Sequence, residues 1–128
     1  MNRIATVLAA LITMGTAANA TTLASGASFG GPTQNNAICY IFNAGGSPVT
    51  IVGTVEIISQ FTGVLPLSFN GCGTNSTLAR GAVCNVNANI ANTNPHACRI
   101  VINPDGGLVR GNLSIRAGST VLQNTDFR

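Results

Sequence analysis

The stretch NGCGTNSTLARGAVCNVNANI, residues 70–90, decides the fold class. Its last third alternates polar and apolar residues, with Val86, Ala88 and Ile90 at every second position. Successive side chains of a β-strand point to opposite faces of the sheet, so this alternation predicts a strand with one buried face. Cys84 lies two residues before Val86, and we therefore expect it to point into the core as well.

The same kind of pattern extends outward from this strand in both directions. Clusters of Gly, Pro, Asn, Asp and Ser separate short apolar or alternating runs, and no helical periodicity of useful length is present. The predicted strands cover residues 37–43, 49–60, 64–71, 82–91, 97–103, 108–116 and 121–127. Short strands at this spacing predict an all-β fold, an immunoglobulin-like β-sandwich of about seven strands with two disulfides.

The N-terminal residues have the pattern of an export signal. Residues 1–20, MNRIATVLAALITMGTAANA, open with Arg3, continue through an apolar run and end in the small residues Ala18-Asn19-Ala20. This pattern predicts a secretory signal peptide that is cleaved after Ala20. The alternative is a transmembrane anchor, but the apolar run is shorter than the roughly 20 residues that cross a bilayer. We expect a mature chain without a membrane span that is secreted or periplasmic.

The mature chain is expected to form one domain behind a short leader. Residues 21–36 are rich in Gly, Ser and Thr, with Leu23 and Phe29 as the large apolar residues, and leave room for one short edge strand. Residues 37–128 are assigned to the β-sandwich. Beyond the signal peptide the charged residues are few: Arg80, Arg99, Arg110, Arg116, Arg128, Glu56, Asp105 and Asp126. The net charge of these five arginines and three acidic residues is too small to argue for binding to nucleic acid or to a membrane.

The cysteines are interpreted as structural. An even number in a small exported domain predicts disulfides, because thiols are oxidised outside the cytoplasm. No C-x-x-C pair indicates a redox site, and a zinc site built from Cys72, Cys84, His96 and Cys98 would lack a standard spacing. Of the connectivities that spacing leaves open, we favour Cys39 with Cys98, which joins an early strand to a late one, and Cys72 with Cys84.

Two motifs resemble a known family of exported modules. Cys72, Leu78, Gly81 and Cys84, followed by the alternating strand, resemble the "C…L-x-P-G-x-x-C-x-V" stretch of abnormal-spindle/hydin-type immunoglobulin-like modules, with Arg80 where those modules carry proline. The later stretch VRGNLSI, residues 109–115, is similar to their "G-x-L-x-I" terminal strand. The resemblance implies a bacterial β-sandwich used for binding, adhesion or packing, and it implies no catalytic residue.

The chain has few of the side chains that enzymes use for catalysis. The chain has one histidine and three acidic residues, so we predict no enzyme, no catalytic residue, no metal site and no cofactor. His96 falls in a predicted loop and is expected to be exposed. Glu56 lies inside a predicted strand, either on its solvent face, in a pair with an arginine, or as a buried carboxylate.

The arginines are the remaining candidates for ligand contact. Arg99 is predicted to face away from the core, and Arg110 and Arg116 share the outer face of the strand at residues 108–116. If these strands form a hairpin over residues 104–107, Arg99 and Arg110 would lie close enough to hold a carboxylate or a sulfated sugar. The alternative is a solvated face with no ligand. Arg80 is an exposed turn residue and a fourth candidate.

Three functions from different classes follow from these residues. The first is a non-enzymatic exported module that binds an unidentified envelope or extracellular protein or glycan. The second is a structural subunit of a surface fibre or layer that assembles by strand addition, if the strand at residues 85–90 lies on a sheet edge. The third is a small hydrolase or a hydrolase inhibitor, with residues 92–97 as the inhibitory loop. The oligomeric state is left open.

Overall fold

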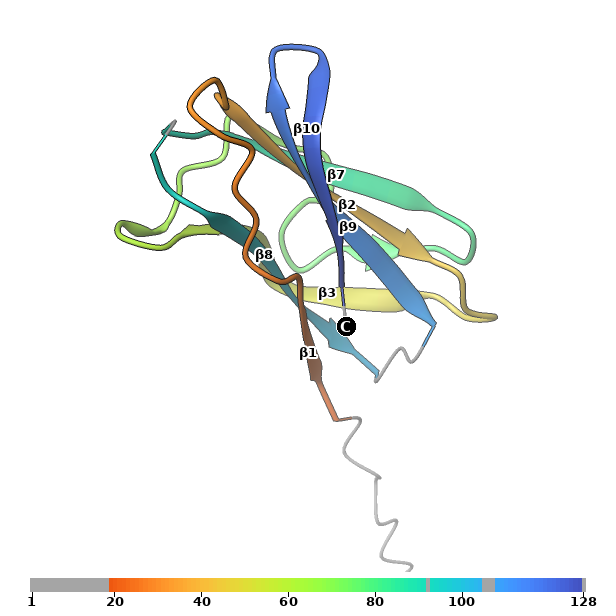
Figure 1. The fold of residues 1–128 in the computed structure, drawn as a ribbon. Helices are drawn as coiled ribbons and strands as arrows, with labels where there is room; N and C mark the ends of the chain where they lie inside the picture. The colour runs from red at the N-terminus through yellow and green to blue at the C-terminus, as the bar shows by residue number, and fades with distance from the viewer. Residues whose placement is uncertain (1–18, 92, 105–107, 128) are drawn as a thin grey trace, which may run out of the picture.

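The computed structural model describes residues 19–91, 93–104 and 108–127 (Figure 1). This part of the chain contains ten strands and no helix. The strands are β1 (Thr21–Ala24), β2 (Asn36–Asn43), β3 (Val49–Ser59), β4 (Gly63–Val64), β5 (Phe69–Asn70), β6 (Thr77–Leu78), β7 (Val83–Asn89), β8 (His96–Asn103), β9 (Val109–Ala117) and β10 (Thr120–Asp126). The all-β prediction is confirmed, and the strand number is higher than predicted.

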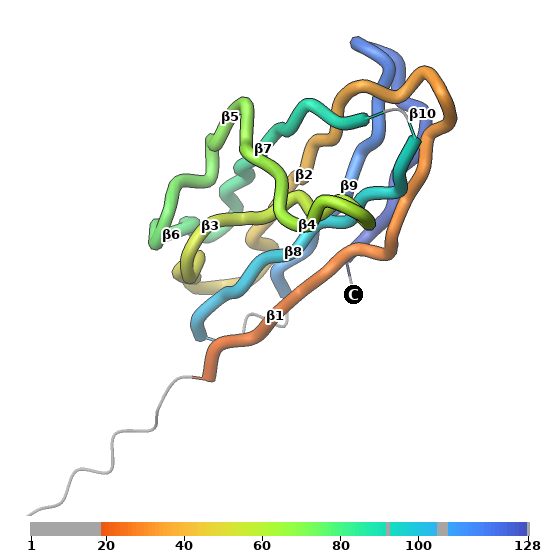
Figure 2. The backbone as a smooth tube through the Cα atoms, turned by 90° about the vertical axis from the view of Figure 1, so that its left-hand side faces the viewer, coloured from red at the N-terminus to blue at the C-terminus, as the bar shows by residue number. Residues whose placement is uncertain are grey.

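Two antiparallel sheets stack face to face (Figures 1 and 2). The first sheet has the order β1-β8-β3-β4, with β6 also paired to β3, and the second has the order β10-β9-β2-β7-β5. Their facing surfaces form the core, whose fully buried members include Ile41, Ile57, Ile100, Leu113 and Ile115. The Cys39–Cys98 disulfide crosses this core from β2 to β8.

The alternating strand behaves as its sequence predicts. In β7, Val86 and Ala88 have no exposed surface, while Asn85 and Asn87 on the opposite face are partly exposed. However, β7 is not a sheet edge, because it pairs with β2 on one side and with β5 on the other. The condition that we attached to strand addition at residues 85–90 is therefore not met. Among the described strands, the first sheet ends at β1 and β4, and the second ends at β10 and β5.

The prediction of one continuous strand at residues 64–71 was wrong. It divides into β4, which pairs with β3 in the first sheet, and β5, which pairs with β7 in the second. Pro66 lies between them and has no N–H group for a ladder hydrogen bond. On either side of it Leu65 N donates to Ile57 O at 2.8 Å and Ser68 N donates to Asn87 O at 2.8 Å. The segment therefore passes from one sheet to the other.

The strands at residues 97–103 and 108–116 do not form a hairpin, which was the condition for a joint site of Arg99 and Arg110. β8 lies in the first sheet between β1 and β3, and β9 lies in the second sheet between β10 and β2. The connection between them thus crosses the sandwich, and its residues 105–107 lie outside the described part. Arg99 and Arg110 consequently belong to different sheets and form no joint binding site.

The leader at residues 21–36 contributes to both sheets. β1 pairs with β8, from Thr21 opposite Ile102 to Ala24 opposite Arg99, and in Figure 2 the chain then climbs one side of the molecule to β2. Gln34 anchors this crossing segment. Its side chain, 2% exposed, accepts from Gly30 N at 2.8 Å and donates to Ala91 O at 2.7 Å and Asn94 O at 2.6 Å.

The predicted signal peptide falls almost entirely outside the described residues. Within the described ranges, no helix has the length and hydropathy to cross a membrane.

Candidate functional site

The outer face of the second sheet collects the polar and aromatic residues that point away from the core. Because Cys39 and Ile41 of β2 are buried in the core, their neighbours Tyr40 and Phe42 point outward. Tyr40 is half-buried and Phe42 is 40% exposed. We use the name outer face for this surface of β2, β7, β9 and the neighbouring part of β10.

Cross-strand register arranges the outer face in rows. In one row Tyr40 lies opposite Asn85 of β7 and Asn112 of β9, and Asn112 in turn lies opposite Asp126 of β10. In the next row Phe42 lies between Val83 and Arg110. Side chains directly opposite each other in adjacent strands are close enough to interact. The face therefore presents aromatic rings with amide groups and arginines beside them.

A shallow depression lies on this face. Its volume is about 260 Å³, and it is lined by Tyr40, Phe42, Arg110, Gly111, Asn112 and Asp126. A side chain at Gly111 would come within 2.7 Å of Tyr40 O and 2.8 Å of the Phe127 ring, so only glycine fits at this close approach. The depression is open and combines one acidic, one basic and one amide side chain with two aromatic rings.

Arg116 is held in place on the outer face by neutral groups. Its Nη2 donates to the Tyr40 hydroxyl at 3.2 Å and its Nε donates to Ser114 Oγ at 3.2 Å. Ser114 is almost completely buried, and Arg116 is half-buried. Arg110, which is exposed, donates from Nη1 to Val109 O at 3.1 Å. The prediction that Arg110 and Arg116 share one face of β9 is consistent with this arrangement.

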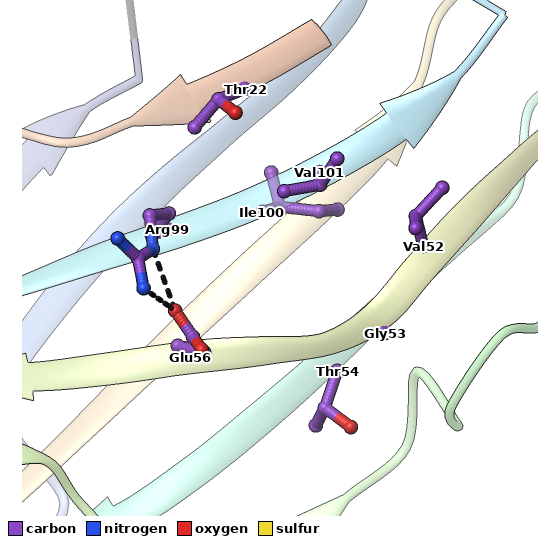
Figure 3. Close-up of a pocket in the computed structure, with 8 residues that line it drawn as sticks. All are labelled: Thr22, Val52, Gly53, Thr54, Glu56, Arg99, Ile100 and Val101. Carbon is purple, nitrogen blue, oxygen red and sulfur yellow. Dashed lines mark hydrogen bonds and ion pairs between the residues drawn. The ribbon is translucent and has the colours of Figure 1, made fainter. Parts of the chain in front are cut away.

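The other two candidate arginines lie elsewhere. Arg99 is on the outer surface of the first sheet, where its Nε and Nη2 both contact Glu56 Oε2 at 2.6 Å (Figure 3). This pair borders a pocket of about 200 Å³ at the bulge of β3, where Gly53 adopts a positive φ of 71°. Of the three alternatives for Glu56, the pair with an arginine is observed. Arg80 is exposed in the turn before β7.

Both disulfides have the predicted pairing. Cys39 is joined to Cys98 and Cys72 to Cys84, with Cα–Cα distances of 6.2 Å and 4.9 Å. Cys39 and Cys98 have no exposed surface, whereas Cys84 is half-buried. No group of three or more His, Cys, Asp or Glu side chains in the described ranges is placed to hold a metal ion.

His96 was predicted to be an exposed loop residue, and this was wrong. It is the first residue of β8 and is 1% exposed, and its backbone pairs with Ser28 of the leader on one side and with Ser59 of β3 on the other. Neither ring nitrogen hydrogen-bonds to the described residues. Burial lowers the pKa of His96 because desolvation disfavours the imidazolium, and the backbone of Asn94 opposes this shift in part.

Stability is expected to fall as the pH falls below the usual histidine pKa of about 6.5. Below pH 6.5 the histidine of the unfolded chain binds a proton, whereas buried His96 of the folded protein does not. The free energy of unfolding is therefore fully retained above pH 6.5 and decreases below it, by at most about 1.4 kcal/mol per pH unit. Urea unfolding between pH 5 and pH 8 measures this slope. His96→Phe, which cannot titrate, is the control; an equal slope in that variant would contradict the assignment to the chain's one histidine.

Sequence reasoning did not identify Tyr40 and Phe42. The run AICYIF, residues 37–42, is almost continuously apolar and shows no alternation that separates its two faces. The usable signal was Cys39, because a disulfide cysteine that points into the core fixes Tyr40 as outward.

We compared the chain with family models, curated proteins and solved structures, and none of them matches it.

Proposed function

We propose that the protein is an exported, non-enzymatic immunoglobulin-like module that binds an envelope or extracellular partner through the outer face of its second sheet. One observation carries the proposal: Tyr40 and Phe42 lie two residues apart on the outward side of β2, beside amide side chains and Arg110 of the neighbouring strands. Aromatic rings and arginines are the residues that most often dominate binding energy at recognition surfaces. Two disulfides also fit an oxidising compartment.

The apolar side chains that are exposed on this face are better explained by binding to a partner than by a contribution to the stability of the fold. Phe42 is 40% exposed, Phe69 of β5 is 52% exposed, and Val83 is 63% exposed. Phe69 lies opposite Asn87 and Val83 lies opposite Phe42, so all three belong to the outer face. Apolar groups gathered on one face and bordered by polar residues are typical of an interaction surface.

The test is retention of the mature protein on immobilised cell-envelope and extracellular glycan fractions. Phe42→Ser is expected to reduce retention about tenfold, because it removes a ring from the centre of the face. Phe61→Ser makes the same chemical change at the tip between β3 and β4, where Phe61 is 72% exposed, and is expected to retain binding. Equal retention of the two variants, or no retention of the unaltered protein on any fraction, would argue against the proposal.

A further inference from the structure

We propose that the outer face binds a polysaccharide that carries carboxylate groups, and that Arg116 and Tyr40 together bind the carboxylate. This inference rests on the proposed function, since it names the partner of the same surface. It begins from a difference between two arginines on the two sheets. Arg99 has its charge matched by Glu56, while Arg116 forms no ion pair with any described residue and is oriented by two hydroxyl groups.

The guanidinium of Arg116 is held in a way that suits a ligand accepting two hydrogen bonds from it. A guanidinium carries five N–H donors, and the hydroxyls of Ser114 and Tyr40 take one from Nε and one from Nη2. These bonds leave the two donors of Nη1 and one donor of Nη2, and the Nη1–Nη2 edge of a guanidinium matches the two oxygens of a carboxylate. Because these two hydrogen bonds fix the long side chain, less conformational entropy is lost when a ligand binds.

Tyr40 adds a further donor beside Arg116. Its hydroxyl oxygen accepts from Arg116 Nη2, which leaves the hydroxyl proton to be donated to an incoming oxygen. Arg110, in the row of Phe42, contributes a second positive charge, against the one negative charge of Asp126 on the same face. The described part of the outer face is therefore positively charged overall, which complements an anionic ligand.

The remaining groups of the face favour a sugar chain over a small acid or an acidic peptide. Amide side chains from Asn85, Asn87 and Asn112 offer donors and acceptors that suit hydroxyl groups, and Asn85 Nδ2 already donates to Asn87 Oδ1 at 2.9 Å. Phe42 provides an exposed ring surface for the apolar face of a sugar. Phe42 and Asn112 line the open depression, and Asn85 and Asn87 lie on the neighbouring strand β7, so an extended ligand that is rich in hydroxyls can reach several of them at once.

The experiment compares a uronic acid polymer with its uncharged ester. Isothermal titration at low salt measures binding of the oxidised mature protein to polygalacturonate, alginate and hyaluronan, and to the fully methyl-esterified form of each polymer. We expect at least one of the three acidic polymers to bind, and its esterified form to bind about tenfold more weakly or not at all. Arg116→Gln is expected to produce a similar loss, while Arg99→Gln on the first sheet leaves the affinity unchanged.

Arg116→Lys keeps the charge and the fold but loses the planar fork, and we expect it to recover only part of the affinity. Equal binding of acid and ester, equal affinity of Arg116→Gln and the unaltered protein, or binding to none of the acidic polymers would overturn the inference. If Phe42→Ser still abolishes retention on envelope fractions in any of these cases, the proposed function stands with a neutral glycan or a protein as partner. If that variant is also without effect, both proposals fail.

Discussion

Replacing Cys39 and Cys98 together with alanine is expected to lower the free energy of unfolding by about 4 kcal/mol. The disulfide closes a loop with a sequence separation of 59 residues, and opening it restores conformational entropy to the unfolded chain. Both cysteines are fully buried between the sheets, so their removal also leaves a cavity that the surrounding strands fill only in part. Against a typical stability of about 5 to 15 kcal/mol, this loss is large.

The matched control is the Cys72→Ala, Cys84→Ala variant. This loop spans 12 residues, and the same chain-entropy argument gives about 3 kcal/mol, with a smaller cavity term because Cys84 is half-buried. Urea unfolding of the two double variants and of the unaltered protein measures the difference. An equal or larger loss for the Cys72–Cys84 pair would show that the link between the sheets is not the main covalent contribution to stability.

Replacing Gln34 with methionine is expected to lower the free energy of unfolding by about 3 kcal/mol. Methionine has a similar length and fills the same buried space, but it cannot make the three hydrogen bonds of Gln34. One of them closes the turn to Gly30 N, and two tie this segment to Ala91 and Asn94 before β8. The carbonyls of Ala91 and Asn94 would both lose the donor that now joins them. The leader segment is expected to exchange its amide hydrogens faster as a result.

Gln60→Met is the control for this prediction, because Gln60 is exposed at the end of β3 and the substitution is chemically identical. Thermal unfolding and hydrogen exchange of β1 are measured in both variants. If Gln34→Met is as stable as Gln60→Met, the contacts of Gln34 do not hold the leader to the sandwich.

The elements with a clear local pattern were predictable from the sequence. The alternation at residues 85–90 placed Val86 and Ala88 in the core and predicted that Cys84 points the same way. The favoured disulfide pairing, chosen because it joins an early strand to a late one, is confirmed. Side-chain parity in a strand depends only on neighbours one and two positions away, so a short stretch of sequence contains the necessary information.

Features that depend on distant pairing could not be read from local sequence. His96 is buried because two other segments, at Ser28 and Ser59, flank it and extend β8 past its predicted start. The separation of Arg99 from Arg110 has the same origin, since turn residues alone do not reveal whether the following strand stays in the sheet or crosses to the other one.

The candidate site was predictable in part for the same reason. Residues at even spacing along one strand share a face, so β9 alone was enough to predict that Arg110 and Arg116 lie on the same side. The neighbourhood of Arg116 and Tyr40 depends on the pairing of β2 with β9, two strands that are far apart in the chain. Nothing in the local sequence of either strand indicates that the tyrosine hydroxyl and the guanidinium meet.

The pairing order has a consequence for the time course of folding. Thr21 pairs with Ile102 and Asn36 pairs with Arg116, so the earliest strand of each sheet needs a partner near the end of the chain, although β2 also pairs with β7. Loop closure over such distances makes folding slow, and a chain delivered from its N-terminus cannot complete either sheet until most of it has emerged. Until then β1 and β2 present unpaired edges, and this interval is when the newly made protein is most exposed to aggregation.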